Sequence, residues 1–146
     1  MPDGEPSCFL LDANVLVALT SPDHVHHARA HEWFARTSSW ATTPVTESAF
    51  LRLMLNPAVA GAARSPAEVT AVLDALRSLP GHRFLPDDAS LAAPLIDLAG
   101  LQGHRQVTDL HLVNVAARHD AALATFDARI RRSLGPADRR HCAVIG

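Results

Sequence analysis

The sequence predicts an α/β fold, with a mainly parallel central sheet of about five strands flanked by helices on both faces. Short apolar runs of strand length alternate along the chain with longer segments in which apolar residues recur at helical spacing. The runs are almost continuously apolar, which is typical of parallel strands buried on both faces. The 146 residues suit one domain over 1–146, and we expect the proline-broken residues 1–7 to be a flexible N-terminal segment.

The first predicted strand covers residues 8–11, an apolar run that stops at Asp12. We expect a helix over 15–19 with Asn14 as its N-cap, because an Asn side chain can accept a hydrogen bond from a free helical N–H. A second helix over 24–37, capped by Asp23, would follow the Ser-Pro break at positions 21 and 22.

Three histidines of this second helix, His24, His27 and His31, would lie along one side. Two of them have the i, i+4 spacing of a two-ligand zinc site, but no Cys or acid completes a tetrahedral set. We therefore interpret them as a solvated face. The apolar positions of the same helix could equally mark a partner surface.

The middle of the chain is expected to continue the alternation. Residues 40–42 form a weak strand, and a Thr-Pro pair begins a helix over 43–55. The Gly- and Ala-rich residues 58–65 are expected to form a mobile loop. A Ser-Pro pair then begins a helix over 65–79, and residues 82–85 form the third strand.

The last third of the chain supplies the remaining elements. We expect a helix over 91–99, ended by a glycine, and another over 108–118. Residues 122–126 form the fourth strand, 128–133 a short basic helix, and 142–145 the final strand.

Composition excludes several classes of function. All 13 basic residues are arginine, so mechanisms that need a lysine, such as those of P-loop NTPases and Schiff-base enzymes, are ruled out. The formal charge of −2 argues against a uniformly basic nucleic-acid clamp but leaves room for a local basic groove. Two cysteines in apolar runs are expected to be reduced, and no segment is long enough to span a bilayer. We expect a cytoplasmic protein that does not act at a membrane.

Four acids are predicted to meet at one edge of the sheet. Asp12 and Asp127 follow parallel strands, while Glu47 and Asp109 lie at the starts of helices that begin at the same edge, Asp109 as an N-cap. Each acid alone could be only a cap or a turn residue. Together they repel, and no lysine is present to neutralise them. Mg²⁺ or Mn²⁺ bound by carboxylate oxygens is the usual remedy.

These segments resemble a known family. The matching pieces are Leu-Asp-Ala-Asn-Val-Leu at 11–16, Pro-Val-Thr-Glu-Ser-Ala-Phe-Leu-Arg at 44–52 with Asn-Pro at 56–57, Thr-Asp-Leu-His-Leu at 108–112, and Leu-Ala-Thr-Phe-Asp at 123–127. In this order and spacing they resemble a PIN-domain ribonuclease, most closely the VapC-type toxin of a VapBC toxin–antitoxin pair. The resemblance covers residues 8–145 and implies a single PIN domain.

The resemblance implies a function and a site. Asp12, Glu47, Asp109 and Asp127 would be both the catalytic and the metal-binding quartet for Mg²⁺ or Mn²⁺, and Asn14 and Thr125 would support it by hydrogen bonding. A metal-activated water would cleave an RNA phosphodiester. The family also implies a homodimer and a cognate VapB-type antitoxin. Many relatives carry a second acid beside Asp109, whereas this chain has Leu110.

Three arginines after Asp127 are candidates for RNA docking, because the planar guanidinium binds two phosphate oxygens: Arg129, Arg131 and Arg132. A solvated terminal face is the alternative. Two rival functions stay open at this point. One is a non-catalytic PIN-like module whose acidic pocket binds a basic partner, and the other is a DNA-directed metal-dependent nuclease.

Overall fold

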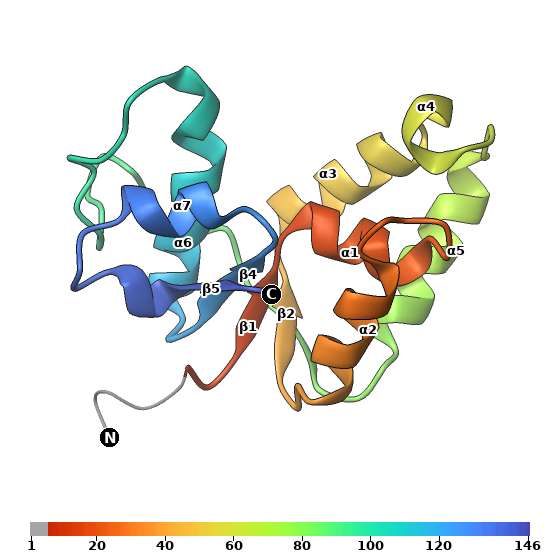
Figure 1. Ribbon diagram of the computed structural model, residues 1–146, viewed down its shortest axis with the longest axis horizontal. Helices are drawn as coiled ribbons and strands as arrows, with labels where there is room; N and C mark the ends of the chain where they lie inside the picture. The colour runs from red at the N-terminus through yellow and green to blue at the C-terminus, as the bar shows by residue number, and fades with distance from the viewer. Residues whose placement is uncertain (1–5) are drawn as a thin grey trace.

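Five parallel strands form the centre of the molecule in the computed structural model, which describes residues 6–146 (Figure 1). The strand order is β3-β2-β1-β4-β5, and every neighbouring pair is parallel. The strands are β1 (Phe9–Leu11), β2 (Trp40–Thr42), β3 (His82–Phe84), β4 (Ala122–Thr125) and β5 (Cys142–Val144). The predicted fold class and all five predicted strands are confirmed.

Helices cover both faces of this sheet. In Figure 1, α6 and α7 lie on one side, and α1, α2, α3 and α5 lie on the other. The helices are α1 (Ala13–Thr20), α2 (His27–Ala35), α3 (Pro44–Met54), α4 (Pro57–Ala60), α5 (Pro66–Arg77), α6 (Val107–Arg118) and α7 (Ala128–Ser133), with 3₁₀ turns at His104–Gln106 and Arg139–His141.

The alternation of side chains along each strand divides the core into two halves. Leu10 and Leu123 are paired in register and pack under α6 and α7, whereas Leu11 and Ala124 pack under α1, α3 and α5. All four side chains are fully buried. The apolar runs read from the sequence are therefore continuous because both faces of the sheet are covered.

Two expectations about regular structure were wrong. Residues 91–99 form turns rather than a helix, because Pro94 lies inside the run and lacks the N–H that a helix interior needs. Part of the expected loop 58–65 is helical, since Asn56 caps α4 by accepting from the Ala58 N–H (3.0 Å) and Gly61 ends it with a left-handed φ of +78°.

Three expected helix starts are also shifted. Asp12, rather than Asn14, caps α1 by accepting from the Ala13 N–H (2.8 Å). Helix α2 begins at His27, so Asp23 does not cap it. Asp109 lies in the first turn of α6, whose N-cap is Gln106. In each case the hydrophobic pattern placed the helix correctly but not its first residue, and of these three only α1 begins at a side-chain cap hydrogen bond.

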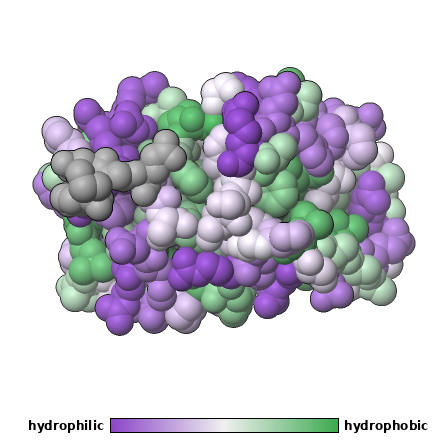
Figure 2. All heavy atoms as spheres, turned by 90° about the horizontal axis from the view of Figure 1, so that it is seen from below, coloured by the Kyte–Doolittle hydropathy of each residue, from purple (hydrophilic) through white to green (hydrophobic). Residues whose placement is uncertain are grey.

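The expectation of a flexible segment over 1–7 concerns mostly residues 1–5, which lie outside the described part of the chain. Within that part, the Ser7 hydroxyl donates to the Asp120 carbonyl oxygen (3.0 Å). No helix among residues 6–146 is long and apolar enough to cross a membrane. Figure 2 shows hydrophilic and hydrophobic side chains interspersed over the described part of the face seen from below.

Two glycines with positive φ offer a test of the packing between β2 and β3. A Cβ on Gly81 (φ +85°) would lie 2.1 Å from the Ser38 carbonyl oxygen, whereas a Cβ on Gly61 would meet no atom within 4 Å. We expect Gly61→Ala to lower the free energy of unfolding by about 1 kcal/mol through backbone strain alone. Gly81→Ala should lower it by roughly 3 kcal/mol, because the clash adds to the strain. Urea denaturation measures both, and equal losses would contradict the clash.

Candidate metal-binding nuclease site

One hydroxyl group connects two of the predicted site acids at the carboxyl edge of the sheet. Thr125, the last residue of β4, donates its hydroxyl hydrogen to Asp12 Oδ2 (2.9 Å) and accepts from the Asp127 N–H (3.1 Å). Because β1 and β4 are paired in parallel, Asp12 leaves the sheet beside Thr125 although the two lie 113 residues apart. The sheet therefore places Asp12 and Asp127 at one site.

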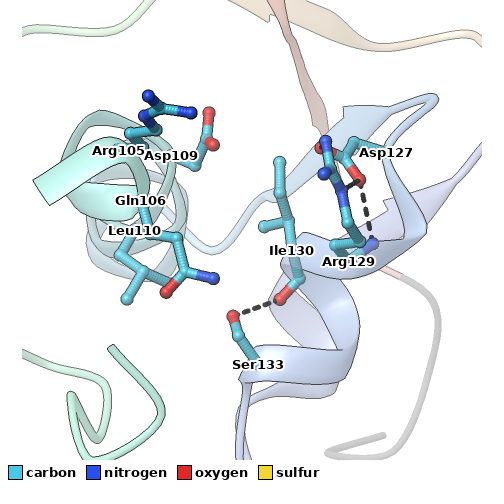
Figure 3. A pocket seen from close by; sticks show the side chains of 8 residues that line it. All are labelled: Arg105, Gln106, Asp109, Leu110, Asp127, Arg129, Ile130 and Ser133. Atoms are coloured by element: carbon cyan, nitrogen blue, oxygen red, sulfur yellow. Dashed lines mark hydrogen bonds and ion pairs between the residues drawn. The ribbon is translucent and has the colours of Figure 1, made fainter. Parts of the chain in front are cut away.

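Asp109 reaches the same site from the other wall of a pocket. Asp109 lies on α6 and Asp127 at the start of α7, and the two helices enclose a pocket of about 350 Å³ (Figure 3). Arg105 stands beside Asp109 at the α6 wall, while Ile130 lies toward the pocket from α7.

The electrostatics of this pocket show that three acids share one environment. Burial raises the pKa of Asp109 to about 6, and the negative charges of Asp12 and Asp127 add to the rise. Burial also raises the pKa of Asp12, against hydrogen bonds from Thr125 and Ala13 that lower it, and the charge of Asp127 contributes to the rise. Asp12, Asp109 and Asp127 thus lie near enough for their negative charges to repel one another.

Asp127 differs from its neighbours because it has a cation of its own. Arg129 donates from Nε to Oδ1 (3.0 Å) and from Nη2 to Oδ2 (3.1 Å), and its backbone N–H also donates to Oδ1 (3.0 Å). These bonds hold the pKa of Asp127 below its ordinary value. Asp127 is therefore kept ionised, and Arg129 belongs to the site rather than to a free basic face.

Glu47 is not brought into the pocket between α6 and α7. Its Oε2 accepts from the Thr42 hydroxyl (2.6 Å), and its Oε1 lies 3.5 Å from Arg77 Nη1. The same Thr42 hydroxyl lies 2.8 Å from His82 Nε2, whose pKa is lowered by burial and by the Arg77 charge. Glu47 stands at the carboxyl edge of β2, as expected, with Arg77 as a partner that sequence spacing did not reveal.

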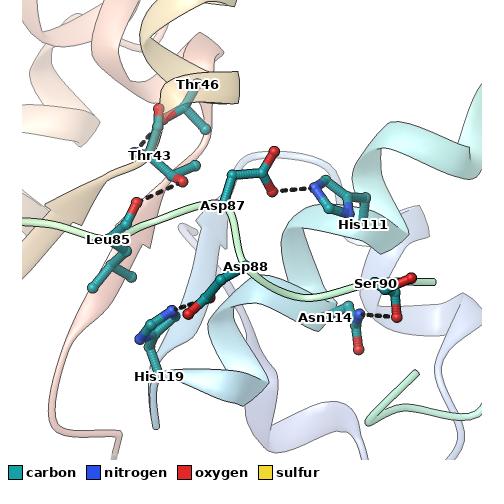
Figure 4. Close-up of polar contacts among 9 residues, drawn as sticks. All are labelled: Thr43, Thr46, Leu85, Asp87, Asp88, Ser90, His111, Asn114 and His119. Carbon is teal, nitrogen blue, oxygen red and sulfur yellow. Dashed lines mark hydrogen bonds and ion pairs between the residues drawn. The ribbon is translucent and has the colours of Figure 1, made fainter. Parts of the chain in front are cut away.

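A strap formed by residues 85–95, after β3, contacts α6, which carries Asp109, and the start of α3, which carries Glu47 (Figure 4). His111 Nε2 lies 2.6 Å from Asp87 Oδ1, and His119 Nε2 lies 2.7 Å from Asp88 Oδ1. Asn114, fully buried on α6, accepts from the Leu95 N–H (2.8 Å). His111 and Asn114 therefore anchor α6 to the chain that follows β3.

At the other end of the strap, the Thr43 hydroxyl donates to the Leu85 carbonyl oxygen (2.8 Å), which fixes the start of α3. The two aspartates of the strap were missed in the sequence. Only their adjacency to a strand end could have suggested them.

The histidines of the second helix were expected to be a solvated face. His31 is exposed, as expected, whereas His24 and His27 are half-buried, and the rings of His27 and His31 both contact backbone carbonyl groups. A ring nitrogen of His27 lies 2.7 Å from the Ala18 carbonyl oxygen, and one of His31 lies 2.9 Å from that of Leu19. These contacts fasten α2 to the end of α1, where carbonyl groups lack helical partners.

The remaining predicted residues occupy different positions. Asn14 is exposed on the first turn of α1, and Arg131 and Arg132 are exposed on α7. Leu110, at the position where many relatives carry a second acid, is 2% exposed, belongs to the core under α6 and also lines the pocket beside Asp109.

The carboxylate oxygens of the site acids suit a hard divalent cation, although their side chains are not arranged as a closed metal site. Asp12, Asp109 and Asp127 offer carboxylate oxygens, which Mg²⁺ and Mn²⁺ prefer, and their repulsion favours a bound cation. Among residues 6–146, no three His, Cys, Asp or Glu side chains lie close enough together to form a metal site. Two of the predicted ligands, Glu47 and Asp127, are instead paired with arginines.

Comparison with known proteins agrees with this architecture. The PIN domain model matches residues 9–133. The chain is 47% identical over 127 residues to ribonuclease VapC39 of Mycobacterium tuberculosis, covering 85% of this chain and 91% of the relative. It is 49% identical over 123 residues to ribonuclease VapC38 of the same species, covering 83% and 86%.

Two solved structures share the fold. The crystal structure of VapBC2 from Rickettsia felis, bound to a DNA fragment from their promoter, matches with a TM-score of 0.55 and 16% identity, covering 87% of this chain and 95% of that one. M. tuberculosis VapC20, a sarcin-ricin loop cleaving toxin, matches with a TM-score of 0.59 and 12% identity, covering 86% and 94%. The chain belongs to the PIN domain family. Within that family, its identity to VapC38 and VapC39 places it among the VapC ribonucleases, as the sequence motifs indicated.

The raised pKa of Asp109 generates a prediction about stability. Because its folded-state pKa of about 6 exceeds the ordinary value of 3.8, the folded state binds more protons than the unfolded state between these values. Stability is therefore lost as pH rises through this window, and the full cost is present at pH 7. Without metal, Asp109→Asn removes this repelled charge and should raise the Tm at pH 7. We expect a rise of only about 3 °C, because solvent screens part of the repulsion at this partly exposed group. At about pH 4 the gain should vanish, since the carboxyl group is then largely protonated.

Thermal melts in EDTA at several pH values measure this difference. Asp74→Asn, on the exposed face of α5, is the matched control and should leave the Tm unchanged. If Asp109→Asn instead lowers the Tm at pH 7, and by the same amount as at pH 4, then Asp109 does not repel the other acids.

Proposed function

We propose that the protein is an endoribonuclease that depends on Mg²⁺ or Mn²⁺ and cleaves RNA phosphodiester bonds at the pocket between α6 and α7. The observation that carries the proposal is the convergence of Asp12, Asp109 and Asp127 at one sheet edge, where burial and mutual repulsion raise two of their pKa values. The names of the curated relatives support RNA as the substrate.

The chain's own groups would divide the work. A bound divalent ion would lower the pKa of a water molecule and stabilise charge on the phosphate. Asp12, held in one orientation by Thr125 and by the Ala13 N–H, and Asp109 on the α6 wall of the pocket would hold that ion. Asp127, kept ionised by Arg129, would be the third ligand, and Arg129 would then be free to bind a phosphate oxygen.

The proposal assigns secondary roles to three further residues. Glu47 would complete the quartet by giving up its contact with Arg77, which at 3.5 Å is longer than a strong ion pair. Asn14, exposed two residues after Asp12, would support the quartet by hydrogen bonding, while Thr125 keeps Asp12 in place.

We further propose that the protein is a cytoplasmic homodimeric toxin neutralised by a VapB-type antitoxin. The match to the VapBC2 complex of Rickettsia felis supports an antitoxin partner. The like-charged pocket also suits a basic group from such a partner. A non-catalytic module that only binds a basic segment is the second candidate, favoured by the two acids that are already paired with arginines.

Removal of single carboxylates tests the catalytic proposal. Asp12→Asn and Asp109→Asn should each reduce metal-dependent cleavage of a mixed RNA pool by at least about 100-fold, because a neutral amide is a poor ligand for a hard cation. Cleavage is measured with Mg²⁺, with Mn²⁺ and with EDTA, and Asp74→Asn serves as the control. Retained activity in a folded variant would remove that residue from the mechanism.

The same assay separates the rival functions. An equimolar DNA of the same sequence should stay intact, and its cleavage in preference to RNA would support a DNA-directed nuclease. If the wild-type protein binds divalent metal but cuts neither nucleic acid, the non-catalytic module is the better description.

The arginines of α7 provide a separate test of RNA docking. Arg129→Gln, Arg131→Gln and Arg132→Gln combined should weaken RNA binding and lower the slope of log K against log salt by about 0.7 for each lost phosphate contact. A second variant with only Arg131→Gln and Arg132→Gln leaves the Arg129–Asp127 pair intact and shows which part of the loss comes from that pair. An unchanged slope in both variants would assign the cluster to a solvated face.

A further inference from the structure

An arginine-lined groove runs along the outer edge of β5, outside the pocket that holds the acids. It consists of two adjoining hollows of about 410 Å³ and 500 Å³ that share Arg131, Arg139 and Val144. The first also contacts Arg132, and the second continues past Arg140 to Arg36 and Trp33 at the end of α2. Because β5 is an edge strand, the groove lies between the helices of the two faces and is lined by residues of α7 and of the end of α2.

The groove carries positive charge that the described part of the chain does not compensate. Among residues 6–146, no carboxylate lies within 4.0 Å of its five arginines, which are Arg36, Arg131, Arg132, Arg139 and Arg140. Asp138, the one acid after Asp127 in the sequence, accepts instead from the Asp97 N–H (2.8 Å). This concentration stands out in a protein whose formal net charge is −2.

The groove begins next to the acids. Helix α7 starts at its cap residue Asp127 and forms a wall of both features, with Arg129 lining the acid pocket and Arg131 lining the groove. A chain bound along β5 would therefore enter the acid pocket around α7 without crossing the protein core.

We propose that this groove binds the sugar–phosphate backbone of single-stranded RNA on one side of the cleavage point, an inference that rests on the proposed ribonuclease activity. Exposed guanidinium groups bind phosphate oxygens in pairs, and an aromatic ring within a basic groove gives bases a surface on which to stack. Trp33 supplies that ring, held by an edge contact with Phe9 at 5.3 Å between centroids. The groove thus extends the substrate contact from α7 to the far end of α2.

Two arginines distant from the acids make the sharpest test. Arg36→Gln and Arg140→Gln combined remove two exposed charges at the far end of the groove. The matched control combines Arg64→Gln and Arg83→Gln, two exposed arginines, of which Arg83 lies on the opposite edge strand β3. Wild type, variant and control are compared on a long single-stranded RNA and on versions shortened from either end, with binding measured over a range of salt concentrations.

We expect the variant to bind the long RNA roughly tenfold more weakly at ~0.1 M salt, with a salt slope lower by about 1.4, which is the loss of two phosphate contacts. In cleavage, the variant should raise KM for the long RNA and lose most of the preference for long over short substrates. The control should keep both. For the wild type, shortening the RNA from one of its two ends, but not from the other, should weaken binding as the two substitutions do.

Several outcomes would overturn the inference. If the wild type cleaves RNA and the variant matches it in affinity, salt slope and length preference, the groove does not bind RNA, while the ribonuclease proposal stands. If an acidic polypeptide such as polyglutamate loses affinity in the variant but RNA does not, the groove serves a protein partner. If the wild type cleaves no RNA, the proposed function itself fails, which is a separate result.

Discussion

The parallel pairing of β1 with β4 is the contact on which both the core and the site depend. It joins segments more than 100 residues apart, so it closes the chain into one sheet and covers Leu10 and Leu11 on opposite faces. The same register sets Asp12 beside Thr125, whose hydroxyl reaches both Asp12 and the Asp127 N–H. A shift of one residue would exchange the two buried faces and separate these groups.

The charges of the site are balanced unequally, and this inequality defines its chemistry. Asp127 and Glu47 each have an arginine, whereas Asp12 and Asp109 have hydrogen bonds or partial burial but no ion pair with another residue of the described range 6–146. Two acids with raised pKa values thus stand next to one that is held ionised. Such a set stores repulsion in the folded state, which a divalent cation or a basic partner group would relieve. The proposed catalysis and the proposed neutralisation by an antitoxin therefore draw on the same feature.

All basic residues of the chain are arginines and none is lysine, and two contacts in the structure use the planar guanidinium group. Arg129 uses its planar group to hold both oxygens of Asp127, and Arg77 lies over the ring of Phe84 (4.7 Å) while it contacts Glu47. A lysine, with its single ammonium group, could not hold both carboxylate oxygens of Asp127 with two separate N–H donors in this fork geometry. The arginines along β5 differ from these because no carboxylate of residues 6–146 pairs with them. Their guanidinium groups, apart from the Arg139 Nε that donates to the Leu134 carbonyl oxygen, are left for an external anion.

The sequence by itself determined the fold class, the five strands, the family and the edge of the sheet at which the four acids stand. These features follow from hydrophobic periodicity and from the rule that parallel strands end at one edge, and both are local or topological properties that a single chain displays. Tertiary structure decided the rest. Only the fold brought the Asn114 side chain to the Leu95 N–H. Arg77 meets Glu47 because α5 packs beside α3, a contact between residues 30 positions apart that no spacing rule contains. Side-chain partners of this kind depend on the distances between packed elements, and those distances exist only once the core has formed.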